Sequence, residues 1–429
     1  MNTSPVPVFL AAGVRTPFLK AGGDFAHLDA IGLSVPVAQA MMARIPEVRP
    51  DLFVWGAVIP NLTWSSIGRE VILDAGLDAT IPAYSTIMAC STSMVGAFQA
   101  AGMLDGRSRQ LAVVGGVESM SRVQIGLSQN LSDWLREFQG AKTLGAKLHQ
   151  LADLSPKDVR LWIPKVVNRT SGMSMGEHTE ITAKEWHITR EEQDALALQS
   201  HQRAVAAWEG GFFDDLVVPV DTPQGQVVRD GLPRKDTSAE RLATLKPAFD
   251  KTSGAGTLTA GNSSALTDGA AAIWVGTEQA MAKLPSGTPM ARLVDWEVAS
   301  VDFRVDGLLM APAFAVPRLL ARHGLTYEDI GLWEIHEAFS AQVAFHIKAW
   351  EDKQFLRDRV GVDVSLGSFP RERMNPNGGS VALGHPFGAT GARILSQAVK
   401  ELAGHPKGAW AIVSICADGG GGTVALLRK

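Results

Sequence analysis

One pattern occurs in both halves of the chain and constrains its fold more than any other. A strand-like run leads to a reactive residue, and a helix of small apolar residues follows. In the first half the run reaches Cys90 and continues at helical length through Met103. In the second half strand-like runs lead to His336 and Cys416, and a glycine-rich loop carries His385 before another helix. This repetition predicts a duplicated α/β architecture whose mostly parallel sheet is covered on both faces.

The expected elements follow from hydrophobic periodicity and from glycine and proline punctuation. Strands are expected at residues 6–12, 52–58, 110–120, 257–264, 269–275, 291–299, 330–335, 409–415 and 423–427. Helices are expected at residues 29–44, 67–75, 132–151, 189–208, 312–323, 339–350 and 392–402. Thr189 and Glu192 have the spacing of a capping box at the start of their helix.

Cys90 is the first candidate for chemistry. We place it in the first turn of a helix that is apolar on all sides, because Val95, Ala97 and Phe98 leave no polar face. Unpaired backbone N–H groups and the helix dipole at such a position lower a thiol pKa towards the reactive thiolate. The alternative interpretation is a packed core cysteine, since unpaired cysteines are among the most buried residues.

Three further polar residues stand at strand ends or in glycine loops, where open α/β sheets bind ligands: His336, His385 and Cys416. A structural alternative for His336 is a histidine bonded to backbone at a helix start, and its motif lacks the His-Glu-x-x-His spacing of a zinc site. The glycines around His385 make a packing role less attractive for it. The run Asp418 to Gly422 leads into a strand, so it is not a phosphate loop.

Composition excludes several classes of function. A net charge of -4 gives no electrostatic footprint for nucleic acid. With only two cysteines, a disulfide framework or a cysteine-based zinc site is not expected. A dinucleotide fingerprint is absent, which argues against a nicotinamide oxidoreductase. No run reaches membrane-spanning length and Met1–Pro7 lacks a secretory pattern, so a cytoplasmic protein is expected.

Taken together, the ordered motifs resemble those of the thiolases over nearly the whole chain. The matching segments are residues 15–18, the Cys90 segment, and residues 115–121, 175–176, 246–250, 260–270, 336–339, 384–393 and 416–420. His336, where many thiolases carry Asn, and the long insertion between Arg122 and Gly172 are similar to the fatty-acid-oxidation thiolases of the trifunctional-complex β-subunit type.

The resemblance implies an α/β thiolase fold with two duplicated βαβαβαββ halves in a five-layered αβαβα core, plus a loop domain. The expected boundaries are residues 1–121 for the first part of the N-terminal half, 122–249 for a loop domain covering the CoA site, 250–288 for completion of that half, and 289–429 for the C-terminal half. It also implies thiolytic cleavage of 3-ketoacyl-CoA by CoA, giving acetyl-CoA and a shortened acyl-CoA.

The resemblance also implies roles for individual residues. Cys90 would attack the 3-keto carbon while His385 takes its proton. His336, through a water, and His385 would stabilise the acetyl-CoA enolate. Cys416 would protonate that enolate and then deprotonate the incoming CoA thiol. The backbone N–H groups of Cys90 and Asp418 would hold the acyl-enzyme oxygen.

Five residues fall at positions that contact CoA in similar thiolases: Met175, Arg234, Ala260, Ser264 and Phe339. CoA enters as a substrate, and neither a bound cofactor nor a metal is expected. Asp418 departs from the family pattern, where glycine is common. A carboxylate beside Cys416 would raise that thiol's pKa unless it points away, and we expect it to point away.

Alternatives to the degradative thiolase are the biosynthetic condensation of two acetyl-CoA molecules, a thiolase-fold acyltransferase that uses Cys90 alone, and a non-catalytic acyl-CoA-binding partner. The presence of both cysteines argues against the last two. The expected partners are acyl-CoA and CoA, a second copy in a homodimer or dimer of dimers, and the hydratase/dehydrogenase α-subunit of a β-oxidation complex. Leu131–Trp162 is either a docking or membrane-contact segment or a helix packed on its own loop domain.

Overall fold

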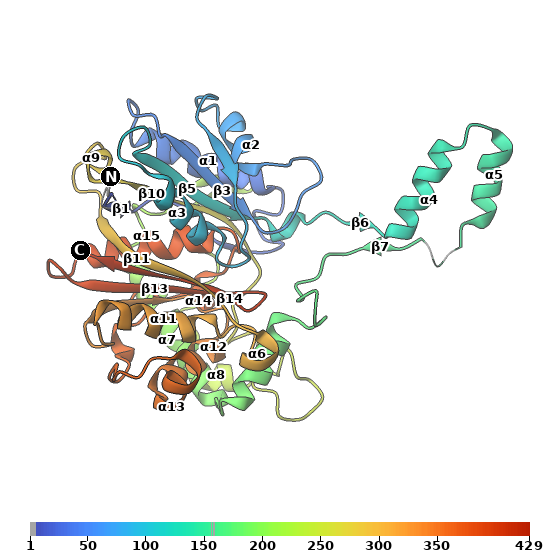
Figure 1. The fold of residues 1–429 in the computed structure, drawn as a ribbon. Coiled ribbons are helices and arrows are strands. Elements are labelled where there is room, and N and C mark those ends of the chain that lie inside the picture. Colours follow the sequence, from blue (N-terminus) through green and yellow to red (C-terminus); the bar gives the residue numbers. More distant parts are fainter. Residues whose placement is uncertain (1–5, 156, 158) are drawn as a thin grey trace.

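Strands from both halves of the chain form the centre of the computed structural model, which describes residues 6–155, 157 and 159–429 (Figure 1). Most of the segment Met1–Pro7, discussed above for its lack of a secretory pattern, lies outside the described residues. The first half supplies β1 (Val8–Ala11), β3 (Leu52–Ala57), β4 (Ala83–Ser85), β5 (Leu111–Glu118) and β10 (Thr267–Thr277), with the short β2 (Leu19–Lys20) beside β10. The second half supplies β11 (Met290–Ser300), β12 (Ile330–Ile335), β13 (Trp410–Ala417) and β14 (Gly421–Arg428).

The strands run in the order β12, β13, β14, β11, β1, β10, β5, β3, β4, and the two halves meet where β1 pairs with β11. The expectation of a mostly parallel arrangement is wrong. Among the described strands, the parallel pairs are β3–β4, β3–β5 and β12–β13, and the other pairs are antiparallel. Helical crossovers produce the parallel pairs. A tight turn at Gly419 and Gly420, with φ of 82° and 78°, instead makes β13 and β14 a hairpin.

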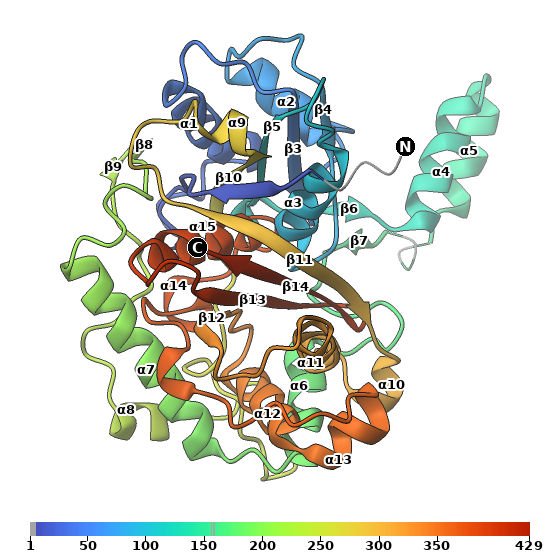
Figure 2. The ribbon, with the colours of Figure 1, turned by 60° about the vertical axis from the view of Figure 1, so that its left-hand side comes forward.

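Helices complete the five αβαβα layers. The main ones are α1 (Ala30–Ala43), α2 (Ile67–Asp74), α3 (Thr92–Met103), α11 (Ala311–His323), α12 (Ser340–Glu351) and α15 (Thr390–Ala403). Short helices are α9 (Glu278–Met281), α10 (Phe303–Asp306), α13 (Lys353–Phe355) and α14 (Ser380–Leu383). The helices α3 and α15 lie between the β layers of the two halves. The helices α1 and α2 cover one outer face, and α11, with α12 beside it, covers the other (Figure 2).

Alternate residues along each strand pack against different layers, as the pleat requires. In β3, Val54 belongs to the core around α3 and α15, while Phe53 belongs to the core under α1 and α2. In β13, Val413 faces the central helices and Ile412 faces α11. These strands are buried on both faces, so they read as continuous apolar runs in the sequence.

The insertion after β5 divides into two parts. The first is an arm, residues 126–162, in which the ribbon β6 (Gly126–Leu127) and β7 (Leu161–Trp162) leads to α4 (Gln129–Gly140) and α5 (Leu144–Asp153). The arm extends away from the layered body (Figures 1 and 2). The single helix expected at 132–151 is therefore wrong. The first helix ends at Gly140, and the Thr143 side chain caps the second by accepting from the Ala146 N–H at 3.1 Å.

The second part of the insertion packs by its helices on the C-terminal half and by its β-ribbon against the first-half core under α1 and α2. It contains α6 (Met175–Glu185), α7 (Arg190–Glu209), α8 (Ala239–Ala243) and the ribbon β8 (Val220–Thr222) and β9 (Gly225–Val227). Both α6 and α7 contact α12. The capping box of Thr189 and Glu192 is confirmed. Among the described residues, no helix is both long enough and apolar enough to span a membrane.

Candidate active site

Cys90 lies in a tight turn between β4 and α3. The helix begins at Thr92, so Cys90 precedes it by two residues instead of lying in its first turn. Ala89 has a φ of 42°, a left-handed conformation that L-residues other than glycine adopt at a cost. The Thr92 hydroxyl holds the turn by accepting from the Met88 N–H at 2.9 Å and donating to the Ala89 carbonyl at 2.7 Å. The chain therefore presents Cys90 in a constrained backbone.

Two histidines from the C-terminal half lie against Cys90. His336 directly follows β12, and its backbone N–H donates to the Ser414 carbonyl at 2.9 Å. His385 precedes α15, and its N–H donates to the Thr267 hydroxyl at 3.0 Å. The imidazole centroids are 4.2 Å apart. The Cys90 sulfur and one ring nitrogen of each histidine lie within 4.8 Å of one another.

Cys416 is the penultimate residue of β13. It lies opposite Gly422 of β14 and is 1% exposed. Burial raises its pKa well above the usual value, and the neighbouring Cys90 raises it further. The Cys90 turn is joined to these strands because the Thr423 hydroxyl donates to the Ser91 hydroxyl at 3.0 Å. The structure therefore brings together all four residues that the sequence singled out.

The Cys90 thiol and the imidazoles of His336 and His385 are neutral near pH 7. Burial raises the pKa of Cys90 to about 12, and the Asp418 carboxylate adds to the rise, while the backbone N–H groups of Asp418 and of Cys90 itself oppose it. Burial lowers the pKa of His385 to about 3, aided by Arg393, and lowers that of His336 well below its usual value. The expected helix-driven lowering of the Cys90 pKa is thus wrong, because desolvation outweighs the dipole.

The Asp418 carboxylate raises the pKa of Cys90, whereas the sequence led us to consider its effect on Cys416. This carboxylate accepts from the Asn168 side-chain amide at 2.8 Å and from the Gly419 N–H at 2.6 Å. It raises the pKa of Cys90, whereas the causes found for Cys416 are burial and Cys90. Asn168 belongs to the segment that connects the arm to α6, a contact that only the tertiary fold reveals.

The expected CoA-contacting residues divide into a group and an outlier. Ser264 donates through its N–H and its hydroxyl to the Ala338 carbonyl, at 3.0 and 2.9 Å, next to Phe339. The Phe339 ring meets the Phe249 ring at 5.7 Å, edge to face, and Phe249 covers Gly176, the neighbour of Met175. The exposed Arg234 instead donates its backbone N–H to His201 of α7 at 3.3 Å.

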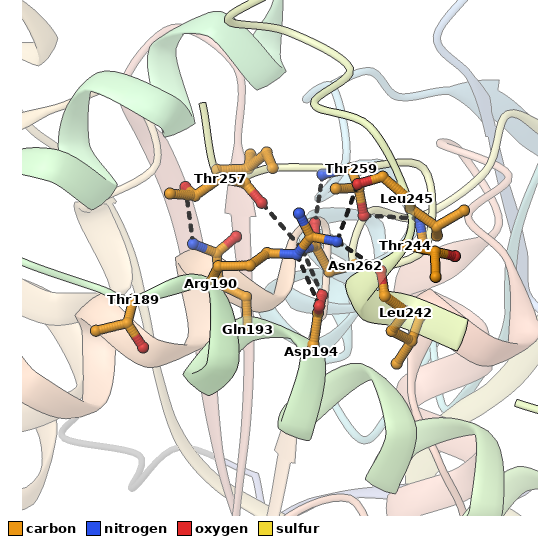
Figure 3. Close-up of polar contacts among 12 residues, drawn as sticks. Thr189, Arg190, Gln193, Asp194, Leu242, Thr244, Leu245, Thr257, Thr259 and Asn262 are labelled. Carbon is orange, nitrogen blue, oxygen red and sulfur yellow. Dashed lines mark hydrogen bonds and ion pairs between the residues drawn. The ribbon is translucent and has the colours of Figure 1, made fainter. Parts of the chain in front are cut away.

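Ala260 and Ser264 lie in a loop where we expected a strand at 257–264. The Asn262 side chain takes the place of a strand partner there. It accepts from the Thr259 N–H at 2.8 Å and donates to the Asp194 carboxylate of α7 at 2.9 Å (Figure 3). Arg190 donates to the same carboxylate at 2.7 Å and ties the loop to α8 through the Leu242 carbonyl (Figure 3). Side-chain hydrogen bonds to backbone thus replace the ladder.

Within the described part of the chain, one group of at least three His, Cys, Asp or Glu side chains lies close enough together to hold a metal ion. It consists of Cys90, His336 and His385. Thiolate and imidazole ligands suit zinc. They equally suit a cysteine nucleophile with histidine bases.

Several residues that support the site were not singled out in the sequence. The hydroxyls of Ser380 and Thr390 contact His336 Nδ1 and His385 Nδ1, at 2.8 and 2.6 Å. The buried Glu118 accepts the N–H of Gly388 at 3.2 Å, and burial raises its pKa to about 7. Thr390, Gly388 and Glu118 all lie in the motifs quoted above, but periodicity alone does not distinguish them from core residues.

Comparison with known proteins identifies the family. A model described as thiolase, N-terminal domain, matches residues 8–279, and one described as thiolase, C-terminal domain, matches residues 287–429. The chain belongs to the thiolase family. It is therefore an acyltransferase, as the sequence motifs indicated.

Relatives and solved structures agree with this assignment. The chain is 36% identical to a 3-ketoacyl-CoA thiolase from Pectobacterium atrosepticum over 98% of this chain and 96% of the relative. It is 37% identical to a 3-ketoacyl-CoA thiolase from Vibrio cholerae over 98% and 97%. An acetyl-CoA acetyltransferase from Bacillus anthracis superposes with a TM-score of 0.78 at 31% identity, over 99% of this chain and 100% of that one. A thiolase from Ascaris suum in complex with coenzyme A gives 0.77 at 28% identity, over 99% and 100%.

Proposed function

We propose that this thiolase works in the degradative direction of fatty acid β-oxidation, cleaving 3-ketoacyl-CoA with CoA to give acetyl-CoA and an acyl-CoA shortened by two carbons. The observation that carries the proposal is the pairing of two thiols, the half-buried Cys90 and the buried Cys416, with two imidazoles. The Nε2 atoms of His336 and His385 have no hydrogen-bond partner among the described residues, although both rings are buried. The relatives named 3-ketoacyl-CoA thiolase support the direction.

In the proposed first half-reaction the Cys90 sulfur attacks the 3-keto carbon and its proton passes to His385. The neutral state of both groups suits a concerted transfer, because a free thiolate is disfavoured in this site. The carbon–carbon bond then breaks, and its electron pair forms the enolate of acetyl-CoA. His336, through a water, and His385 donate hydrogen bonds to the enolate oxygen, an oxyanion-hole role. Cys416 gives its proton to the enolate carbon.

In the proposed second half-reaction Cys416 takes the proton of an incoming CoA thiol, and the resulting thiolate attacks the acyl group on Cys90. The backbone N–H groups of Cys90 and Asp418 hold the acyl oxygen during this step. The hydrogen bonds of both N–H groups to the Cys90 thiol, which lower its pKa, support this role. Acyl transfer releases the Cys90 thiolate, which takes its proton back from His385, so the Cys90 thiol and neutral His385 are regenerated. No bound cofactor or metal takes part.

CoA binding and assembly are also proposed. Met175, Ala260, Ser264 and Phe339 would line the CoA path next to the Phe249 ring, and Arg234 would contact CoA from the exposed loop after β9. We propose that two copies form a homodimer or pair further into a dimer of dimers. The arm would serve as a docking segment for a hydratase/dehydrogenase α-subunit, because it exposes Leu144, Leu148, Leu151, Leu161 and Trp162.

A second candidate is the biosynthetic direction, condensation of two acetyl-CoA molecules to acetoacetyl-CoA. The similarity to the Bacillus anthracis acetyl-CoA acetyltransferase favours it. Both directions use the same groups, so the acyl chain that the site accepts distinguishes them.

Single-turnover acylation tests both candidates. The full-length protein is mixed with acetoacetyl-CoA or with a long-chain 3-ketoacyl-CoA, and the adduct is followed by intact mass, in the wild type and in Cys90→Ser. We expect an adduct on the wild type alone, faster with the long chain and discharged by CoA. Faster reaction with acetoacetyl-CoA would favour the biosynthetic candidate. No adduct with either substrate, or loss of the reaction on adding a metal chelator, would contradict the mechanism.

A further inference from the structure

The two histidines of the site have different hydroxyl neighbours. The Thr390 hydroxyl oxygen lies 2.6 Å from His385 Nδ1, and the same hydroxyl donates to the Pro386 carbonyl at 2.9 Å. A threonine hydroxyl has a single proton. In this structure that proton points to the Pro386 carbonyl, which can only accept and which also receives the backbone N–H groups of Ala389 and Thr390 at 3.0 and 3.1 Å. The contact with His385 therefore requires Nδ1 to carry a proton and donate it, which leaves Nε2 of the neutral ring unprotonated.

The contacts of His336 lead to the opposite result. The Ser380 hydroxyl oxygen lies 2.8 Å from His336 Nδ1 and accepts a hydrogen bond from the Arg393 guanidinium at 2.7 Å. A guanidinium can only donate. Among the hydrogen bonds of the described residues, His336 Nδ1 is the acceptor available to the Ser380 proton. Nδ1 therefore accepts, and the proton of the neutral ring is on Nε2.

The surroundings favour these assignments. Ser380, Thr390 and His336 have no exposed surface, and Arg393 and His385 are 2% and 3% exposed. Exchanging the His336 tautomer would leave the buried Ser380 proton without an acceptor, which is unfavourable where water cannot compensate. Exchanging the His385 tautomer would require the Thr390 hydroxyl to turn its proton to Nδ1 and give up its hydrogen bond to the Pro386 carbonyl. Burial also lowers the pKa of both imidazoles, so each ring is neutral and has one ring proton to place.

We propose that Thr390, and Ser380 held by Arg393, fix His385 and His336 in opposite neutral tautomers, so that His385 Nε2 is a proton acceptor and His336 Nε2–H a proton donor towards Cys90. This assignment divides the roles of two chemically identical side chains. It rests on the proposed function for its catalytic meaning. The Cys90 proton moves to His385 Nε2 as the sulfur–carbon bond forms, while His336 Nε2–H is in place to donate a hydrogen bond when the enolate appears. Thr390, Ser380 and Arg393 are positioning residues.

The tautomers can be read directly by ¹⁵N NMR of the full-length protein with labelled histidine, because protonated and unprotonated ring nitrogens of a neutral imidazole resonate well apart. His336→Asn and His385→Asn assign the two rings by loss of signal. We expect a protonated Nδ1 in His385 and a protonated Nε2 in His336. The same tautomer in both rings, or the reverse pair, would overturn the proposal whether or not the protein performs thiolysis. The expected tautomers with no thiolysis would instead count against the proposed function alone.

Variants then separate the two roles. Thr390→Val keeps the side-chain shape but removes the hydroxyl. It should slow both Cys90 alkylation by iodoacetamide and acylation by acetoacetyl-CoA, by at least about tenfold, short of the roughly 10⁴-fold loss caused by a wrong histidine tautomer in a serine protease. Thr390→Ser should restore both rates. Ser380→Ala should leave alkylation within about twofold while lowering kcat for cleavage with little change in KM, since the lost hydrogen bond acts mainly in the transition state.

Ser396→Ala is the matched control, because Ser396 is another buried serine hydroxyl, on α15, that bonds to Gly13 and Ala272 and not to a histidine. It should change neither rate. Equal slowing of alkylation and cleavage by Ser380→Ala would contradict the division of roles. So would a Thr390→Val protein that alkylates at the wild-type rate. If a variant fails to fold, the wild-type NMR result still decides the tautomers.

Discussion

The charge of Asp418 is the feature by which this site differs most from the pattern that the sequence resembles. Burial is the largest cause of the raised Cys90 pKa, and the Asp418 carboxylate is the second. The backbone N–H of Asp418 lowers that pKa. Asp418→Asn removes the charge and keeps an oxygen that can accept from Asn168 and Gly419. We expect Cys90 alkylation at pH 8 to become several-fold faster, because each unit by which the thiol pKa falls raises the thiolate fraction about tenfold. Asp133→Asn, in the arm, should leave the rate unchanged. An unchanged rate in Asp418→Asn would show that the carboxylate has no effect on the thiol.

The pH dependence of stability can be tested at His346, which the proposed mechanism does not use. Its Nε2 contacts the Leu309 carbonyl at 2.7 Å and its Nδ1 contacts the Gln342 amide at 3.1 Å. Burial lowers its pKa to about 4, from 6.5. A lowered pKa means that the neutral histidine stabilises the fold above pH 6.5 and that this stability is lost as the pH falls towards 4, by up to about 3 kcal/mol.

His346→Gln isolates that effect from the other buried groups. The variant should be less stable than the wild type at pH 7, and the difference in melting temperature should shrink between pH 6.5 and 4. The comparison is needed because burial raises the pKa of Glu334 to about 8, which contributes stability at low pH that is lost as the pH rises. A constant difference across this range would mean that His346 titrates normally.

At the scale of single residues, the sequence identified the candidate site residues by their position relative to the expected strands. Cys90, His336, His385 and Cys416 could be found because each lies at or beyond the end of an expected strand or in a glycine loop. Their protonation states could not, because they depend on burial and on partners far away in the chain. Ser380 contacts His336 from 44 positions away and is itself held by Arg393, which is 57 positions from His336, and no local pattern encodes these contacts.

At the scale of elements, most helices and strands formed where periodicity placed them, and the exceptions have local causes. Asn262 satisfies the backbone near Thr259 and so prevents a strand there. Gly140 and the Thr143 cap divide one expected helix into two. Both signals are readable in the sequence but are weaker than the apolar pattern that surrounds them.

The arm can be removed at a defined point. Gly126 and Trp162 are opposite each other in the ribbon, so a short Gly-Ser turn can replace residues 127–161. The helices of the arm pack on each other, and the layered body lies apart from them (Figure 1). We expect the shortened protein to keep its thiolysis rate and to melt within about 2 °C of the wild type, because few buried contacts are lost. A docking arm would additionally lose binding to an α-subunit in a pull-down assay.

Asn168→Ala provides the comparison for that deletion. It keeps the arm but removes the hydrogen bond to Asp418. Loss of activity in both proteins would point to the arm's attachment as a support of the Cys90 site. Loss of activity on deletion alone would contradict the view that the arm is separate from catalysis.

At the scale of the whole molecule, the sequence indicated two similar halves but not how they join. The Cys90 site belongs to both, since Cys90 comes from the first half and His336, His385 and Cys416 come from the second. The Ala392 N–H donates to the Ser93 hydroxyl at 2.8 Å, which links the starts of α15 and α3. Such contacts depend on the packing of the central helices, and periodicity within each half carries no information about them.

The close approach of α3 and α15 should make folding of the site inseparable from folding of the molecule. A Cβ on Gly391 would lie 2.2 Å from the backbone nitrogen of Met94, and backbone cannot move aside as a flexible side chain can. Gly391→Ala must therefore push the two central helices apart, at a cost of about 3 kcal/mol or more. We expect little soluble protein, or a single lowered transition in which circular dichroism and the protection of Cys90 are lost together.

Gly102→Ala is the matched control, because it lies on α3 with nothing within 4 Å of the added Cβ. Replacing an exposed helical glycine by alanine should stabilise the protein by up to about 1 kcal/mol. If Gly391→Ala melted like the wild type, α3 and α15 would have room for the added methyl group, contrary to the 2.2 Å separation from the Met94 nitrogen. If it unfolded in two steps, with Cys90 released first, the joint between the halves would be a separate unit of stability, and the two halves would fold independently of the site they share.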